Sequence, residues 1–504
     1  MDQSSITPNT SNQQLVASDN DSATALLHEK QGRRRENLRD VSYVEYITVG
    51  ILCFVNLINY MDRFTLAGVL SDVKKEFSIG DDLAGLLQTV FVVAYMIFAP
   101  IFGYLGDRYS RRHIMAFGVA LWSMTTFAGS YITNFYAFAV FRGLVGIGEA
   151  SYSTIAPTII SDLFVGNIRS KMLAFFYFAI PVGSGFGYIV GSVAGAAAHN
   201  WRWGLRVTPF LGAVAVALIT WVMRDPERGQ AEESHMKPTS YREDLRALVR
   251  NPSFMLSTLA FTCVAFVTGA LAWWGPQFIY LGFTMQPDIN VTQESVSYKF
   301  GLVSMVAGAL GVPLGAALAQ RLRAAARDAD PLLCGFALLA SAPLVYFALV
   351  AAAAHQALTY FLIFLGMLTL NLTWSVVADI VLYVVIPPRR STAEAFQILI
   401  SHMFGDAGSP YLVGVISENL KRALVTAAHP AGSKAVQFRA LQYALFVTCF
   451  VEVLGGVFFL ISAAYIVRDK LKVDRAIAEA EAQSTEPSHS NAHEDIIGSG
   501  DQGP

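Results

Sequence analysis

Charged residues are scarce in this sequence. They make up 15% of the 504 residues, whereas soluble globular domains carry about 25%. Hydrophobic residues make up 54% of the chain, and they gather in repeated stretches of about 20 residues, each long enough to cross ~30 Å of hydrocarbon as a helix. The composition therefore excludes a soluble domain and predicts an all-α polytopic membrane protein.

Motifs for nucleotide, metal and hydrolytic chemistry are absent as well. The sequence contains no Gly-x-x-x-x-Gly-Lys-Ser/Thr, which excludes an ATP-driven pump of the P-loop kind, and neither His-Glu-x-x-His nor Gly-x-Ser-x-Gly. Its four cysteines have no metal-ligand spacing and are predicted to be buried packing residues: Cys53, Cys263, Cys334 and Cys449. We therefore expect no enzyme, no metal or organic cofactor, and no nucleic-acid partner.

Twelve apolar segments predict membrane spans, six on each side of a longer polar gap. They cover residues 44–70, 83–106, 113–132, 135–163, 171–197, 204–223, 253–282, 299–322, 331–353, 357–386, 393–416 and 440–467. The predicted organisation is a disordered cytosolic arm (1–43), an N-terminal six-helix bundle (44–223), a cytosolic linker (224–252), a C-terminal six-helix bundle (253–467) and a cytosolic tail (468–504). Arg169–Phe175 and Arg390–Phe396 occupy equivalent positions in the two halves, as expected for two parallel repeats.

Basic residues predict the orientation of the chain, because arginine and lysine accumulate in cytosolic loops. They gather in the arm at Arg33–Arg35, in alternate loops between the spans, and after the last span at Arg468–Lys472. Both termini are therefore expected in the cytosol. The sequon at Asn290 falls on the opposite side and predicts N-glycosylation there. No apolar segment follows Met1, so the first helix is expected to act as the signal-anchor.

Several charged residues lie inside predicted spans, where a charge at the bilayer centre costs about 2.5–3.5 kcal/mol. Arg142 and Glu149 are seven residues apart, close to two helical turns, so they are expected on one side of their helix. Asp62 and Arg63 are neighbours, about 100° apart around the axis, so they should face different partners. Two interpretations stay open: a polar site inside the bundle, or structural ion pairs between helices.

The loop between the second and third spans, Gly103–Arg112, resembles the signature loop of the major facilitator superfamily, Gly-x-Leu-Ala-Asp-Arg-x-Gly-Arg-Arg/Lys. Ser110 replaces the usual glycine, and the charges are kept. The resemblance implies the major facilitator fold, with twelve helices in two six-helix bundles. It also implies a charged inner gate, which we assign to Asp107, Arg108, Arg111, Arg112, Asp162 and Asp379.

Further segments resemble the spinster family of lipid transporters, over nearly the whole membrane region. They are Asn59–Phe64, Arg142–Pro157, Phe175–Gly185, Asn251–Phe254, Val377–Pro387, Arg390–Gln397 and Ser401–Tyr411. The pattern is nearest to the lysosomal branch, and the resemblance implies a proton-linked secondary transporter of lysophospholipids that works as a monomer. The sister branch implies export of sphingosine-1-phosphate or a related single-chain sphingolipid. A membrane receptor or scaffold that keeps the fold is the competing class.

Site roles follow from the chemistry of the side chains within that resemblance. Guanidinium suits a phosphate headgroup because it makes planar bidentate contacts and stays charged when desolvated, so Arg63 and Arg142 are predicted to bind the substrate. An amphiphile with an acyl chain also needs an apolar track, and the aromatic residues predicted to bind it are Tyr60 and Tyr152. Protons are the only expected coupling species. A buried carboxyl or a histidine can carry them, so the predicted proton-coupling residues are Glu149, Asp62 and His402.

The predicted location is the lysosomal or late endosomal membrane, with the plasma membrane as the alternative. Besides the family resemblance it rests on Leu26 and Leu27 in the N-terminal arm, which resemble an acidic dileucine sorting motif whose acid, Asp21, stands one residue too far upstream. Phosphorylation of Ser22 would place negative charge at the usual position.

Overall fold

The computed structural model describes residues 41–164, 166–226, 241–287, 290–386, 389–425 and 433–485, and its regular elements there are helices. The N-terminal half contains α2 (Tyr43–Gly68), α3 (Leu70–Phe77), α4 (Asp81–Arg108), α5 (Arg111–Gly129), α6 (Phe135–Leu163), α7 (Gly166–Ala197) and α8 (Arg202–Ala217), which continues into the π-helical turn η2 (Leu218–Val222).

The C-terminal half follows a short amphipathic helix, α9 (Tyr241–Val249). It contains α10 (Pro252–Phe283), α11 (Gln293–Arg323), α12 (Ala329–Ala351), α13 (Gln356–Asn371), α14 (Thr373–Val384), α15 (Arg390–Ser401), the π-helical turn η4 (His402–Asp406), α16 (Ser409–Leu424) and α17 (Lys434–Thr485). Polar caps start several of these helices. The side chain of Asn251 accepts from the amide of Phe254 at the start of α10, and Thr292 caps α11 in the same way.

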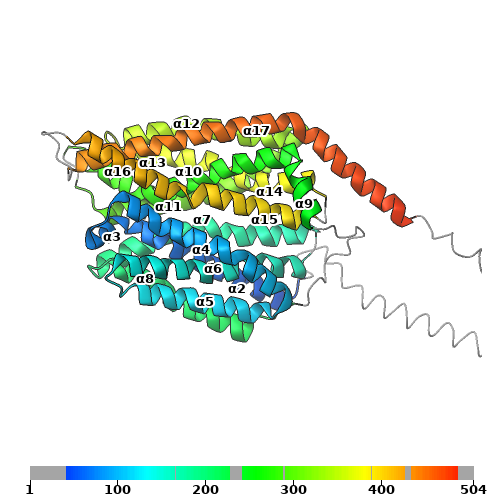
Figure 1. Ribbon diagram of the computed structural model, residues 1–504, viewed down its shortest axis with the longest axis horizontal. Helices are drawn as coiled ribbons and strands as arrows, with labels where there is room; N and C mark the ends of the chain where they lie inside the picture. The colour runs from blue at the N-terminus through cyan, green and yellow to red at the C-terminus, as the bar shows by residue number, and fades with distance from the viewer. Residues whose placement is uncertain are drawn as a thin grey trace, which may run out of the picture.

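The helices form two bundles that lie side by side (Figure 1). Helices α2 to α8 make up the lower bundle in the figure, and α10 to α17 make up the upper one. Helix α3 and the tip of α16 lie at one end, which we call the α3 end, and α9 lies at the other, the α9 end (Figure 1). Helix α17 runs along the upper bundle and projects beyond the α9 end.

Nine helices in the described ranges are long and apolar enough to cross a membrane, three fewer than the sequence prediction of twelve spans. The other three predicted spans correspond to α5, to α6, and to α15 with η4 and α16. Helix α5 begins with two arginines, α6 contains Arg142 and Glu149, and the last of the three is interrupted by η4. All three pack within the bundles, α6 against α4 and α5, and α16 against α4 and α17.

Buried apolar side chains join the two bundles at the α3 end. One hydrophobic cluster there includes Leu70 and Leu87 of the N-terminal bundle together with Trp274 and Val413 of the C-terminal bundle. Two further clusters are centred on Trp122 in the N-terminal bundle and on Phe254 in the C-terminal bundle, and the first of them also includes Ala407 of the C-terminal half. The bundles are therefore in apolar contact at the α3 end.

Candidate functional site

Two ion pairs cross between α2 and α6 in the interior of the N-terminal bundle. Arg63 Nη2 lies 3.4 Å from Glu149 Oε2, and Arg142 Nη1 lies 3.8 Å from Asp62 Oδ2. All four residues are buried, with at most 6% of any one exposed. Arg142 and Glu149 therefore do not pair with each other. Seven residues span about 10 Å along one helix, too far for direct pairing, so α2 supplies the partners.

Asp62 is held by more than one partner. Thr208 of α8 donates to Oδ1, and Thr126 of α5 donates to Oδ2 at 3.2 Å. Arg142 also donates to the main-chain carbonyl of Arg63, at 3.1 Å. Four helices of the N-terminal bundle, α2, α5, α6 and α8, thus meet at the Asp62 carboxylate, which fixes its position.

The other ion pair is less completely satisfied. Glu149 Oε1, Arg63 Nε and Arg142 Nε are buried and have no hydrogen-bond partner among the described residues, and neither polar atom of the Asn59 side chain has one. Buried polar atoms are nearly always paired with protein groups or water. Because several such atoms surround Arg63 and Glu149, the site has hydrogen-bonding capacity left for another polar group.

Aromatic rings surround the two guanidinium groups. Arg63 Cζ lies 5.1 Å from the ring centre of Tyr60, 4.9 Å from that of Phe91 and 5.6 Å from that of Tyr95. Arg142 Cζ lies 4.6 Å from the centre of the same Phe91 ring. Cation–π contacts of this kind stabilise a desolvated arginine by about 0.5–2 kcal/mol each. Phe91 therefore supports both arginines at once.

The C-terminal bundle faces this cluster through the π-helical turn η4. His402 Nδ1 lies 2.8 Å from Asp406 Oδ1, and the His402 ring lies edge to face with Tyr95 of α4 at 6.0 Å between centroids. Thr89 of α4 donates to the carbonyl of Ala407 at 2.5 Å, which ties the two bundles at this level. Sequence reasoning missed Asp406, although a carboxylate four residues after an intramembrane histidine was a usable signal.

Tyr152, the remaining predicted substrate residue, lies deeper in the N-terminal bundle. Its side chain is fully buried, and its hydroxyl donates to the carbonyl of Leu52. The ring packs against Trp122 and Phe176, with centroids 6.2 and 6.4 Å away. Tyr60 therefore lies beside the Arg63 guanidinium, whereas the Tyr152 hydroxyl is hydrogen-bonded to the backbone of α2.

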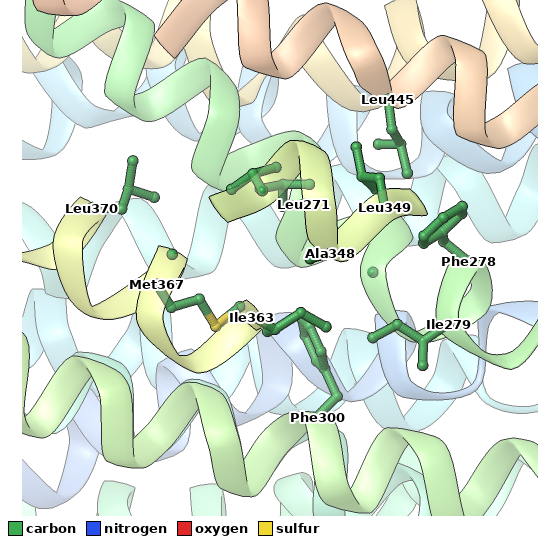
Figure 2. A pocket seen from close by; sticks show the side chains of 13 residues that line it. Leu271, Phe278, Ile279, Phe300, Ala348, Leu349, Ile363, Met367, Leu370 and Leu445 are labelled. Atoms are coloured by element: carbon green, nitrogen blue, oxygen red, sulfur yellow. The ribbon is translucent and has the colours of Figure 1, made fainter. Parts of the chain in front are cut away.

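An apolar cavity of about 50 Å³ lies inside the C-terminal bundle (Figure 2). It is enclosed by α10, α11, α12, α13 and α17, and its lining consists only of hydrophobic residues and glycine. Phe278, Phe300, Leu349 and Met367 are among the side chains that border it in Figure 2. The N-terminal bundle therefore contains buried charge, whereas the C-terminal bundle contains an apolar space.

Three of the predicted inner-gate residues, Arg111, Asp162 and Asp379, take part in charge clusters at the α9 end, one in each bundle. Arg111 Nη1 contacts Asp162 Oδ2 at 2.5 Å, and Arg111 Nε contacts Asp225 Oδ1 at 3.2 Å. Asp379 instead contacts Arg323, which sequence reasoning did not single out, at 2.8 Å.

The other predicted gate residues lie nearby. Arg108 stacks over Tyr104 with 4.4 Å from Cζ to the ring centre, and Arg112 donates to the carbonyl of Met223 at 3.5 Å. Asp107 belongs to the last turn of α4, and its side chain lies outside the described part of the structure.

A further charge cluster, at the α3 end, joins the two bundles. Asp81 of α4, only 1% exposed, contacts Lys74 and accepts from Ser417 Oγ of α16 at 2.7 Å. Lys421 Nζ of α16 lies 2.5 Å from Asp81 Oδ2 and 3.1 Å from Glu418 Oε2. We call Lys74, Asp81, Ser417, Glu418 and Lys421 the α3-end cluster.

Two glycines allow α4 and α16 to approach each other beside the α3-end cluster. A Cβ atom on Gly414 would lie 2.3 Å from the carbonyl oxygen of Asp81, and one on Gly85 would lie 2.3 Å from that of Pro410. Any larger residue at either position would force the backbones apart. This end of the molecule is thus closed by backbone contact as well as by charge.

The sequon residue and the dileucine pair are the last of the predicted positions. Asn290 is exposed in the loop between α10 and α11. Leu26 and Leu27 lie outside the described residues. Within those residues no group of three or more histidine, cysteine or acidic side chains is arranged to hold a metal ion.

The chain is similar to known transporters in sequence and in fold. A sequence profile of the Major Facilitator Superfamily matches residues 52–409. Protein spinster of Drosophila melanogaster is 57% identical over 490 residues, covering 88% of this chain and 81% of the relative. Protein spinster homolog 1 of Homo sapiens is 52% identical over 437 residues, covering 84% of this chain and 81% of the relative.

A solved structure shows the same fold. It is described as a bacterial homolog to human lysosomal transporter, spinster, in an inward-facing and unoccupied conformation, and it matches with a TM-score of 0.74 at 19% identity over 85% of this chain and 98% of that one. The predicted fold class and family are confirmed, and the protein is a multi-pass membrane transporter and not an enzyme. The chain belongs to the spinster family of the major facilitator superfamily.

Proposed function

We propose that this transporter moves lysophospholipids across the lysosomal or late endosomal membrane by proton-coupled alternating access. The observation that carries the proposal is the Arg63–Glu149 pair. It is buried, long at 3.4 Å, and surrounded by polar atoms without partners among the described residues. A strong structural salt bridge has shorter contacts and satisfies its remaining donors and acceptors. This pair instead has capacity for an anionic headgroup.

The N-terminal bundle offers buried charge and the C-terminal bundle an apolar cavity, and a lysophospholipid needs both. A lysophospholipid has one phosphate and one acyl chain, so it needs a cation and an apolar surface. Arg63 offers the cation, with Arg142 as the second candidate, and Tyr60 lies beside the guanidinium of Arg63. The apolar cavity of the C-terminal bundle (Figure 2), at about 50 Å³, offers apolar surface to a short part of the acyl chain, and it borders Phe300 of α11, which packs against Tyr188 of α7 with 5.1 Å between ring centroids.

Proton coupling follows from competition for one guanidinium. Glu149 and a substrate phosphate both need Arg63, and two anions at one buried cation repel each other. Protonation of Glu149 frees Arg63 for phosphate, and departure of the proton restores the ion pair and expels the substrate. Asp62 and His402 are the other candidates to carry the proton. Asp62 already accepts hydrogen bonds from two hydroxyls and pairs with Arg142, so Glu149 is favoured as the proton carrier.

Alternating access requires the bundles to separate at the α3 end and to meet at the α9 end. We assign the closed state of the α3 end to the α3-end cluster and the gate at the other end to the charged residues around Arg111 and Asp162. The cytosolic arm (1–43), linker (224–252) and tail (468–504) would then lie on the α9 side of the membrane. Glycosylation of Asn290 would mark the luminal side.

A sphingosine-1-phosphate exporter is the second candidate, because that lipid also joins one phosphate to one chain. The bacterial structure is described as a homolog of a human lysosomal transporter, and this description supports lysosomal residence. A receptor or scaffold has no use for two buried ion pairs with unsatisfied atoms, each of which costs about 1–3 kcal/mol when left unpaired.

Flux measurements in proteoliposomes test the proposal. Purified protein is reconstituted, and movement of labelled lysophosphatidylcholine, sphingosine-1-phosphate and diacyl phosphatidylcholine is followed with and without a pH step. We expect lysophosphatidylcholine flux that rises with the pH step and no flux of the two-chain lipid. Flux of sphingosine-1-phosphate alone would support the second candidate, and no flux of any lipid would contradict a transport function for these substrates.

A further inference from the structure

Helix α17 continues well beyond its membrane-spanning part. Its 52 residues extend about 80 Å, whereas the hydrocarbon core is ~30 Å thick. The apolar part of the helix ends at Val467, and four cations follow within the next eight residues: Arg468, Lys470, Lys472 and Arg475. Figure 1 shows this segment leaving the bundle at the α9 end. These cations therefore stand where the helix passes from apolar to polar surroundings.

The two sides of this segment have different environments. Ile466, Asp469 and Val473 are buried and form the side that packs against the protein. The opposite side is open, with 55% of the Arg468 side chain and 63% of the Lys472 side chain exposed. The segment is therefore an amphipathic continuation of a span.

The open side is one helical face, whose residues recur at intervals of three or four positions: Ala464, Val467, Arg468, Leu471, Lys472 and Arg475. Its first residues are apolar and continuous with the span, and cations dominate further along. We call this surface the basic face of α17. The order matches a phospholipid, whose acyl chain lies inside the bilayer and whose phosphate lies at its surface.

Asp469 fixes the start of the basic face. Its carboxylate accepts from Ser253 Oγ at 2.7 Å, at the beginning of α10, and so anchors α17 to the bundle. The same carboxylate lies 3.3 Å from Arg468 Nε and 3.1 Å from Lys472 Nζ. One buried acid therefore lies beside two of the three cations of the basic face, and the face keeps an excess of positive charge. The excess positive charge is complementary to an anionic headgroup.

We propose that the basic face of α17 binds the headgroup of an anionic membrane phospholipid at the surface next to the α9 end. The acyl chain of that lipid lies against Ala464, Val467 and Leu471, and its phosphate lies among Arg468, Lys472 and Arg475. The site is separate from the Arg63–Glu149 site and does not depend on the proposed transport substrate. It makes the protein sensitive to the lipid composition of the surrounding leaflet.

Native mass spectrometry of the full-length protein tests this proposal, with dioleoylphosphatidylserine as the anionic probe and dioleoylphosphatidylcholine as the neutral one. We expect wild type to retain phosphatidylserine preferentially. Each Lys or Arg near a membrane surface contributes about a fivefold increase in affinity for anionic lipid, so R468Q/K472Q/R475Q should lose most of that preference. If the triple variant does not fold, R475Q alone should still show about a fivefold loss.

The matched control removes the same number of cations from the opposite end of the molecule. R422Q/K434Q/R439Q changes three exposed basic residues near the α3 end, and it should keep the preference for phosphatidylserine. R468K/R475K, which keeps the charge, should keep it too. Equal binding of the two lipids by wild type would overturn the proposal, as would an equal loss in the control. An acidic segment such as residues 486–504 seated on this face would give the first of these results.

Discussion

Removal of the Lys421 ammonium should open the α3 end. Lys421 is the cation of the C-terminal bundle that reaches Asp81 in the N-terminal bundle, with 2.5 Å between Nζ and Oδ2. In Lys421→Gln, Asp81 keeps Lys74 of its own bundle and the Ser417 hydroxyl, so the protein should still fold. What is lost is the charge attraction that holds α4 and α16 together.

The size of the effect follows from burial. The Lys421 side chain is 13% exposed and that of Asp81 is 1% exposed. Exposed ion pairs contribute at most about 1 kcal/mol, and breaking a fully buried one costs about 3–5 kcal/mol. A value of about 2 kcal/mol lies between them and corresponds to a change of about 30-fold in the ratio of closed to open molecules.

Double electron–electron resonance measures this ratio directly. Spin labels at Asp82 on α4 and Asn419 on α16, with the native cysteines changed to alanine, report the separation of the two helices. We expect Lys421→Gln to add a population at longer distance. The control is Lys75→Gln, because the Lys75 side chain is 75% exposed and its ammonium pairs, within the described residues, with Asp72 of its own helix at 3.6 Å. A distribution identical to that of the unsubstituted protein would refute the assignment of the α3-end cluster as a gate.

Substitutions at three further positions test the site. Glu149→Gln should leave folding and delivery to the membrane intact and abolish the response of lipid flux to a pH step. Glu149→Lys should stop transport altogether, because it places a second cation beside Arg63. If the Gln variant keeps the pH dependence of wild type, the proton-coupling role passes to Asp62 or His402. Phe91→Leu should raise the KM for lipid at least severalfold while protein yield stays normal, because it removes both cation–π contacts at about 0.5–2 kcal/mol each. An unchanged KM would rule out a role of Phe91 in positioning Arg63 and Arg142. Tyr152→Phe should lower thermal stability by about 1 kcal/mol and leave substrate affinity unchanged, because the lost hydroxyl bonds only to the backbone; a large loss of affinity would restore Tyr152 to the substrate site.

Most of the fold was predictable from the sequence, because apolar length and loop charge determine the spans and their order. The charged residues Asp62, Arg63, Arg142 and Glu149 were equally visible, since a charge inside an apolar run stands out. Their pairing was not. Which helices adjoin is a tertiary fact, so the sequence showed Arg142 and Glu149 on one helix and did not show that α2 supplies the partner of each.

The α3-end cluster was not found for a related reason. Asp81 looked like one of several loop acids that balance Lys74 and Lys75, and Lys421 lies about 340 residues further along the chain. Only the close approach of α4 and α16 at Gly85 and Gly414 brings them together. The aromatic side chains show the same limit. Phe91 and Tyr95 belonged to a long series of intramembrane aromatics, and only the three-dimensional arrangement selects those that contact Arg63.

A structure of the protein bound to lysophosphatidylcholine, determined by cryo-electron microscopy, tests the central claim most directly. We expect the lipid phosphate to lie within hydrogen-bonding distance of the Arg63 guanidinium and Glu149 to have moved out of contact with Arg63. The acyl chain should extend toward the apolar cavity of the C-terminal bundle. A bound lipid whose phosphate touches neither Arg63 nor Arg142, with the Arg63–Glu149 pair intact, would contradict it.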